Sequence, residues 1–146
     1  MPFTQVTTCL ICEGARQELG GKYNLLGFYG VAPNVNVSII DFNLPVTLCL
    51  FFVGGPGSGQ FHVGLRLTAQ SGEVVPLPPS AELDVNLITG KRITYLILVI
   101  NQRLPGPGRY RAELVVNGAP GFAAEFELAQ GSVAQMRTQY PGEVSE

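Results

Sequence analysis

The chain has 146 residues, which predicts a single domain large enough to bury a core without help from a metal or a disulfide. Charged residues make up only 14% of it, against about 25% in an average domain, and the formal net charge is −2. No basic stripe is present, which argues against nucleic acid and anionic membranes as partners. The low charge and the 46% of hydrophobic residues instead indicate a surface that binds protein, a second copy of the chain included.

The sequence opens Met1-Pro-Phe-Thr-Gln, without positive residues ahead of an apolar run, so we expect no secretory signal. Its longest apolar runs, at residues 44–53 and 93–100, are far shorter than the ~20 residues of a membrane-spanning helix. A cytoplasmic location is the expectation.

A charged stretch follows the first predicted strand, which covers residues 3–12. It is the densest group of charges in the chain and contains Glu13, Arg16, Glu18 and Lys22. Paired carboxylates with basic neighbours can act in acid–base chemistry where burial shifts their pKa values, so a small-ligand or enzymatic site is one hypothesis. The alternative is a solvated turn with surface ion pairs worth about 0–1 kcal/mol each. We favour the turn, because no nucleophile accompanies these charges.

The three cysteines are Cys9, Cys12 and Cys49. The spacing of Cys9 and Cys12 is that of half a zinc site, but the sequence has no second pair, and His62 is its only histidine. Residues three apart on a strand point to opposite faces, so these two thiols should not converge. We therefore expect buried free thiols, with no metal site and no cofactor.

Residues 12–22 have the pattern C-E-x-x-R-x-E-x-x-G-K, and Gly27 follows it. In this pattern the stretch resembles the N-terminal signature of small bacterial proteins of unknown function, which are similar in length and all-β. The resemblance covers about the first thirty residues, and only the later Pro-Gly-x-Tyr and Asn-Gly features match beyond them. It implies an all-β fold and implies no activity, cofactor or partner.

Alternating apolar residues predict further strands in the middle of the chain. Residues 22–31 are expected to be partly covered on both faces, and residues 44–53 to form a central strand. The remaining predicted strands of this region lie at residues 33–40, 61–69, 73–77 and 80–88.

The loop from Gly54 to Gly59 resembles the phosphate-binding loop of adenylate kinases. Gln60 stands where that loop needs lysine, and Phe61 stands where it needs a hydroxyl residue. Strand alternation also begins where the loop should open a helix. We therefore expect a flexible hairpin loop, and nucleotide binding at Gly54–Gly59 is kept only as an alternative. His62 should lie on the outer face of the strand that follows.

Residues 93–100 form a continuous apolar run rich in β-branched side chains, which predicts a strand covered on both faces. A Pro-Gly turn follows, and residues 109–116 alternate as a half-buried strand. In this strand Gly108-x-Tyr110 resembles the tyrosine corner of immunoglobulin-like sandwiches, whose hydroxyl bonds to the backbone just upstream.

Asn117 and Gly118 predict a hairpin turn. A two-residue loop would mix charged and core side chains on one face. We therefore predict a three-residue loop over residues 116–118, which pairs Ala112 with Phe122 and Tyr110 with Ala124. Positive φ and a bulge are expected at Gly118.

Together these elements predict an all-β, two-sheet antiparallel sandwich of the immunoglobulin or fibronectin type, with a jelly-roll or C2-like sandwich as the alternative. Residues 1–130 form the domain, and residues 131–146 form a tail, either a short helix or a docking arm, with a frayed end. We expect a non-enzymatic structural or protein-interaction module that self-associates or joins a larger assembly. The charged stretch and the glycine-rich loop carry the two alternative functions.

Overall fold

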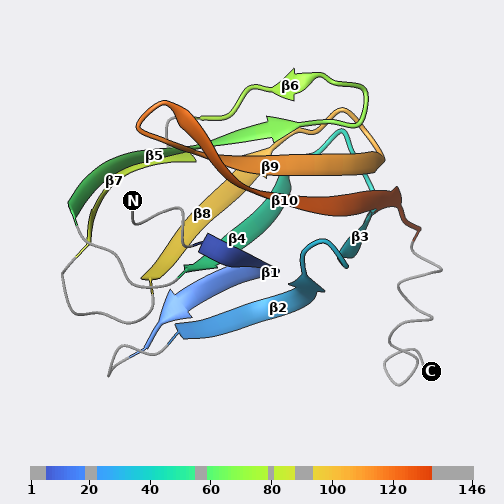
Figure 1. Ribbon diagram of the computed structural model, residues 1–146. Coiled ribbons are helices and arrows are strands. Elements are labelled where there is room, and N and C mark those ends of the chain that lie inside the picture. Colours follow the sequence, from blue (N-terminus) through green and yellow to red (C-terminus); the bar gives the residue numbers. More distant parts are fainter. Residues whose placement is uncertain (1–5, 19–22, 55–58, 79–80, 88–93, 133–146) are drawn as a thin grey trace.

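The structure is a computed structural model that describes residues 6–18, 23–54, 59–78, 81–87 and 94–132. Ten strands in these residues form two sheets that pack face to face, with β9 and β10 (orange) in one layer and β1 and β2 (blue) in the other (Figure 1). The predicted all-β two-sheet sandwich is confirmed. No helix long and apolar enough to cross a bilayer occurs in the described residues.

Sheet A has four antiparallel strands in the order β2-β1-β4-β8. Their bounds are β1 Val6–Gln17, β2 Tyr23–Val31, β4 Val46–Gly54 and β8 Thr94–Gln102. The predicted central strand is confirmed, since β4 lies between β1 and β8.

Sheet B has the order β3-β10-β9-β5-β6, and β7 also pairs with β5, beside β6. Its strands are β3 Asn36–Ile39, β5 Gly59–Thr68, β6 Val74–Val75, β7 Glu82–Leu87, β9 Gly108–Val116 and β10 Ala119–Gln130. One pair departs from the predicted antiparallel pattern, because β3 and β10 run parallel.

The core lies between the inner faces of the two sheets, where alternate residues of each strand are buried. Its largest fully buried side chains are Tyr110, Phe52, Phe126, Ile11, Leu48, Leu50, Leu67, Leu98, Ile100, Leu114, Leu128 and Val63. Two-residue alternation explains these positions, as the sequence predicts.

The two edge strands of sheet A expose apolar side chains. β8 has no second neighbour among the described strands, so it is an edge strand. Its outward Val99 is 44% exposed. β2 is the opposite edge, where Leu26 and Phe28 are 45% and 54% exposed. The outer face of β8 is therefore less covered than predicted, whereas the partial cover predicted for β2 agrees with these values.

β1 is also longer than predicted and continues through Gln17. Residues 13–17 are therefore part of a strand paired with β2, and the predicted turn can lie only beyond them. The ring of Tyr23, at the start of β2, packs edge-on against Phe51 of β4, with 5.3 Å between the ring centres. The far end of the β1–β2 hairpin therefore lies against the outer face of sheet A.

The β9–β10 turn has two residues, because Val116 pairs with Ala119. Asn117 and Gly118 have φ values of 48° and 82°, as a two-residue turn that matches strand twist requires. The positive φ predicted at Gly118 is confirmed, while the predicted three-residue loop is wrong.

An irregularity farther along β10 brings the apolar side chains inward. The register shifts between Pro120 and Ala123, after which Ala112 is opposite Ala124 and Tyr110 is opposite Phe126. The predicted pairings of Ala112 with Phe122 and Tyr110 with Ala124 are therefore wrong, as is the bulge predicted at Gly118. The alternation of apolar residues requires one extra residue in this hairpin but does not say where it lies. A bulge in the strand and a longer loop both return the following side chains to the same face.

The tyrosine corner is present. The hydroxyl of Tyr110 donates a hydrogen bond to the carbonyl of Gly106 at 2.6 Å, and the Tyr110 side chain is buried. This bond ties the start of β9 to the connection that crosses from sheet A to sheet B. At the same end of the domain, the amide of Gly131 bonds to the carbonyl of Ile39. The predicted tail beyond Ser132 lies outside the described residues.

Candidate functional site

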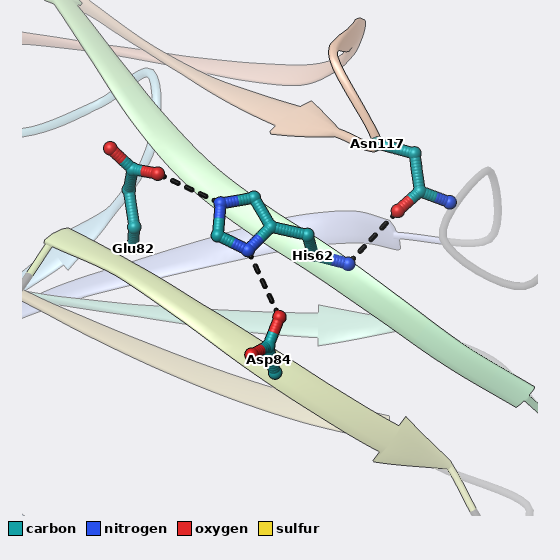
Figure 2. Close-up of polar contacts among 4 residues, drawn as sticks. All are labelled: His62, Glu82, Asp84 and Asn117. Atoms are coloured by element: carbon teal, nitrogen blue, oxygen red, sulfur yellow. Dashed lines mark hydrogen bonds and ion pairs between the residues drawn. The ribbon is translucent and has the colours of Figure 1, made fainter.

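A polar site on the outer face of sheet B is built around His62. Its ring lies between two carboxylates of β7 (Figure 2). Nε2 is 2.8 Å from Oε1 of Glu82, and Nδ1 is 3.0 Å from Oδ1 of Asp84. β5 supplies the histidine and β7 supplies both acids, so the site joins two neighbouring strands.

Strand register explains this arrangement. His62 is directly opposite Asp84, and Gly64 is opposite Glu82, so Glu82 is the diagonal neighbour of the imidazole. Because Gly64 has no side chain, Glu82 can lean across it, and a Cβ at Gly64 would lie 3.3 Å from Cγ of Glu82. The glycine therefore makes room for the second carboxylate.

The backbone of His62 is held by a third element. Its amide donates to Oδ1 of Asn117 at 2.9 Å, and its carbonyl accepts from the amide of Asn117 at 2.8 Å. Asn117 therefore shapes the β9–β10 turn and also anchors that turn to β5. The sequence indicates the turn but not this second role.

The two carboxylates favour the charged imidazole. Hydrogen bonds to Asp84 and then Glu82 raise the pKa of His62 above its ordinary value of 6.5. The protonated ring donates to both acids, whereas a neutral ring has one N–H and can donate to only one of them. The site is thus a charge-dependent link between β5 and β7.

The geometry argues against catalysis by this histidine. Both ring nitrogens are engaged, and the two carboxylates lie on opposite sides of the ring instead of converging on one point. The described residues contain no group of three His, Cys, Asp or Glu side chains that could hold a metal ion. An open hollow of about 350 Å³ adjoins His62 and Asp84, and Gln60, Phe61, Val85 and Asn86 complete its lining.

The charged stretch of the N-terminal hairpin is only partly brought together. Nε of Arg16 is 2.7 Å from Oε2 of Glu18, and both side chains are largely exposed. The Glu13 side chain instead lies over Gly27 of β2, which has φ of 60° and leaves the space that the carboxylate fills. Lys22 lies outside the described residues.

The glycine-rich loop joins two strands. Gly54 ends β4 and Gly59 begins β5, while residues 55–58 lie outside the described residues. A strand therefore follows the loop at the place where phosphate binding would need a helix N-terminus.

All three cysteines are buried and free, as predicted. Cys9 faces the core, whereas Cys12 lies on the outer face of sheet A directly opposite Cys49. Burial raises the pKa of Cys9 and of Cys49 to about 12, and it also raises the pKa of Cys12. The Cys12–Cys49 pair was not predicted, because strand register cannot be read from the spacing of distant residues.

The two outer faces of the sandwich differ in chemistry. Of the ion pairs in the described residues, all but Arg16–Glu18 lie on the outer face of sheet B. The outer face of sheet A has no charged side chain among the described residues of β4 and β8. Its two edge strands, β2 and β8, expose apolar groups. These groups are Leu26, Phe28 and Val31 on β2 and Val99 on β8.

No protein-family model matches the sequence, and no curated protein matches it. Among solved structures, the chain is similar to the alkylpurine DNA glycosylase AlkC of Pseudomonas fluorescens, bound to DNA containing an abasic site analog. The two share 18% sequence identity with a TM-score of 0.37, over 64% of this chain and 26% of that one. The chain thus matches about a quarter of that protein's length, and a TM-score of this size establishes neither a common fold nor a common function.

Proposed function

We propose that the protein is a non-enzymatic structural or interaction module that self-associates through sheet A. The observation that carries this proposal is the exposed apolar character of that sheet. Leu26, Phe28 and Val31 are exposed by 45%, 54% and 42% on one edge strand, and Val99 by 44% on the other. Apolar side chains that gather on an exposed face are typical of interaction sites.

These exposed groups share one face. Leu26 is opposite Gly14, Phe28 is opposite Cys12, and the register shift after Cys12 restores Val31 to the same side. Without this shift Val31 would point to the inner face. The irregularity in the β1–β2 ladder therefore gathers the apolar side chains of β2 on the outside of the sheet.

A second copy of the chain fits this surface by charge. Because the surface is uncharged across β4 and β8, a strongly charged partner would bury charges there without counterions. A second copy offers an equally neutral surface. The net charge of −2 gives only weak repulsion between two copies.

The alternative of an enzymatic or small-ligand site at Glu13, Arg16, Glu18 and Lys22 has weaker support. Its described ion pair is exposed, and Glu13 is engaged with Gly27. The His62 cluster supports a structural link more than a reaction, since both of its ring nitrogens are already bonded.

The test measures molar mass by light scattering from dilute to concentrated solution, for the wild type and two variants. Val99→Lys places a charge on sheet A, and Val74→Lys is the matched control, because Val74 is 57% exposed on β6 of sheet B. We expect the wild type and Val74→Lys to associate alike and Val99→Lys to raise the dissociation constant at least about tenfold. Equal association of all three would remove sheet A from the interface, and monomers throughout would refute self-association.

A further inference from the structure

We infer that two copies of the chain join edge to edge along β8, as antiparallel strands related by a two-fold axis, so that sheet A continues from one copy into the other. This inference rests on the proposed self-association and states which strand forms the interface. Two sheets could also associate by stacking their outer faces, and the features of β8 favour the edge.

β8 has the composition of an interior strand in the position of an edge strand. The nine residues of β8 are TYLILVINQ, without a charge, a proline or a glycine. Edge strands usually carry charges, prolines or irregularities that discourage pairing, so such a run is unusual at the edge of a sheet. In the described residues β8 has only one neighbour, β4, so the free side is where a further strand is expected.

β8 is also regular along its length. Its register with β4 runs from Val46 opposite Gln102 to Gly54 opposite Thr94 without a shift. A regular, uncharged edge presents a continuous row of backbone donors and acceptors, which is a template for another strand.

The other edges in the described part of the fold carry features that discourage such pairing. β2 is interrupted by a register shift and by positive φ at Gly27 and Gly30. β3 has four residues, and β6 has two and is followed by Pro76. β7 carries the acids Glu82 and Asp84. β8 has none of these features.

The direction of the backbone groups in β8 follows from one hydrogen bond. The carbonyl of Cys9 accepts from the amide of Ala32 at 2.9 Å, on the β2 side of β1, so the backbone groups of Cys9 point away from β4. In an antiparallel ladder, the backbone N–H and C=O groups of two opposed residues either both point toward each other or both point away. Phe52, opposite Cys9, therefore points its groups toward β8.

Leu96 is opposite Phe52, so its backbone groups point back at β4. Because this direction alternates along a strand, the amides and carbonyls of Ile97 and Val99 point to the free edge. These two residues also show their side chains on the outer face, where Val99 is 44% exposed. The same residues therefore offer the edge hydrogen bonds and the apolar contacts.

A second copy fits this edge better than an unrelated chain. An antiparallel pair of β8 strands brings uncharged residues against uncharged residues, and inward apolar residues meet inward apolar residues. The interface is then isologous, as in two-fold dimers generally. The pairing also brings Ile97 and Val99 of each copy together.

The first experiment separates edge from face with three variants, whose masses are compared with that of the wild type by sedimentation. Val99→Pro removes an amide that points to the free edge and leaves the β4 ladder intact. Val99→Thr keeps this amide and strand preference, and Phe28→Ser alters the outer face on the far edge strand. We expect Val99→Pro to be monomeric and the other two to associate within about threefold of the wild type, a difference of about 0.6 kcal/mol.

The second experiment needs no variant and covers the case in which Val99→Pro fails to fold. Amide hydrogen exchange is measured for Ile97 and Val99 of the wild type at high and at low protein concentration. We expect both amides to exchange at least about tenfold more slowly in the associated protein. Free exchange of both amides in an associated wild type, or association of a folded Val99→Pro, would overturn the edge joint and leave self-association standing. A wild type that stays monomeric would overturn both.

Discussion

The outer faces of the two sheets carry different kinds of side chain. Sheet B alternates apolar residues inward with charged residues outward, and Arg109, Arg111 and Glu125 pair across β9 and β10. Sheet A carries apolar or small residues on both faces of β4, where Phe51 and Cys49 are as buried as the core residues. A solvated sheet face is usually polar, so this difference supports the proposed self-association through sheet A.

Part of the outer face of sheet A is covered by its own chain. The β1–β2 hairpin places Tyr23 on Phe51, which protects the middle of the face and leaves the edges exposed. The outer face of sheet A is thus covered at its centre and open at its edge strands, where a second chain can extend the sheet.

The largest expected effect comes from Phe51, which is 3% exposed although it points away from the core. Phe51→Ala should lower the free energy of unfolding by about 3–5 kcal/mol, because a large buried side chain leaves a cavity. Urea unfolding measures it, with Arg111→Ala on the outer face of sheet B as the control, expected within about 1 kcal/mol of the wild type. Similar losses in both variants would mean that the two outer faces do not differ.

The thiols of sheet A should be nearly inert in the folded protein. Raising the pKa of Cys49 from 9.0 to about 12 lowers the thiolate fraction near pH 8 by about a thousandfold. Alkylation followed by mass spectrometry should therefore show almost no labelling of Cys12 and Cys49 until urea unfolds the chain. Rapid labelling of the folded chain would show that this face is open to solvent at its centre.

Sheet B should instead respond to pH through His62. Its folded pKa lies above its unfolded value, so its stabilising effect is complete below about pH 6.5 and is lost as the pH rises through the folded pKa. His62→Gln should unfold at lower urea concentration than the wild type in acid and at nearly the same concentration in alkali. The chain has one histidine, so an NMR titration reports this pKa without ambiguity, and a value at or below 6.5 would contradict the link.

The smallest effect concerns Glu125. Arg109, and then Arg111, hold the pKa of this carboxyl below its ordinary value of 4.5, so its contribution is present above pH 4.5 and is lost as the pH falls through the lowered pKa. Glu125→Gln should lower stability slightly at neutral pH and not in strong acid. The control is Glu127→Gln, since Glu127 makes none of the ion pairs found in the described strands. Equal pH curves for both variants would show that the arginines do not matter.

The sequence predicts most of the strands because alternation of side chains is local. It also predicts the tyrosine corner at Tyr110 and the positive φ of Gly118, both of which depend on one short segment. What it cannot supply is register between distant strands. The pairing of His62 with Asp84 and of Cys12 with Cys49 depends on register, and so does the bulge after Pro120.

The composition of a strand also does not predict how exposed its side chains are. Residues 93–100 predict a strand covered on both faces, whereas β8 is an edge strand whose outward Val99 is 44% exposed. An apolar run alone therefore does not say whether its outward side chains are covered within the chain. The candidate site at His62 was missed for the opposite reason, since a single histidine on a strand gives no sign of its cross-strand partners.

The most direct test is the sedimentation equilibrium of the unaltered protein near neutral pH, because it asks whether the apolar outer face of sheet A finds a partner in its own copy. We expect a mass that rises with concentration toward twice the 15.6 kDa of one chain. A mass that stays at that of one chain in concentrated solution would contradict it.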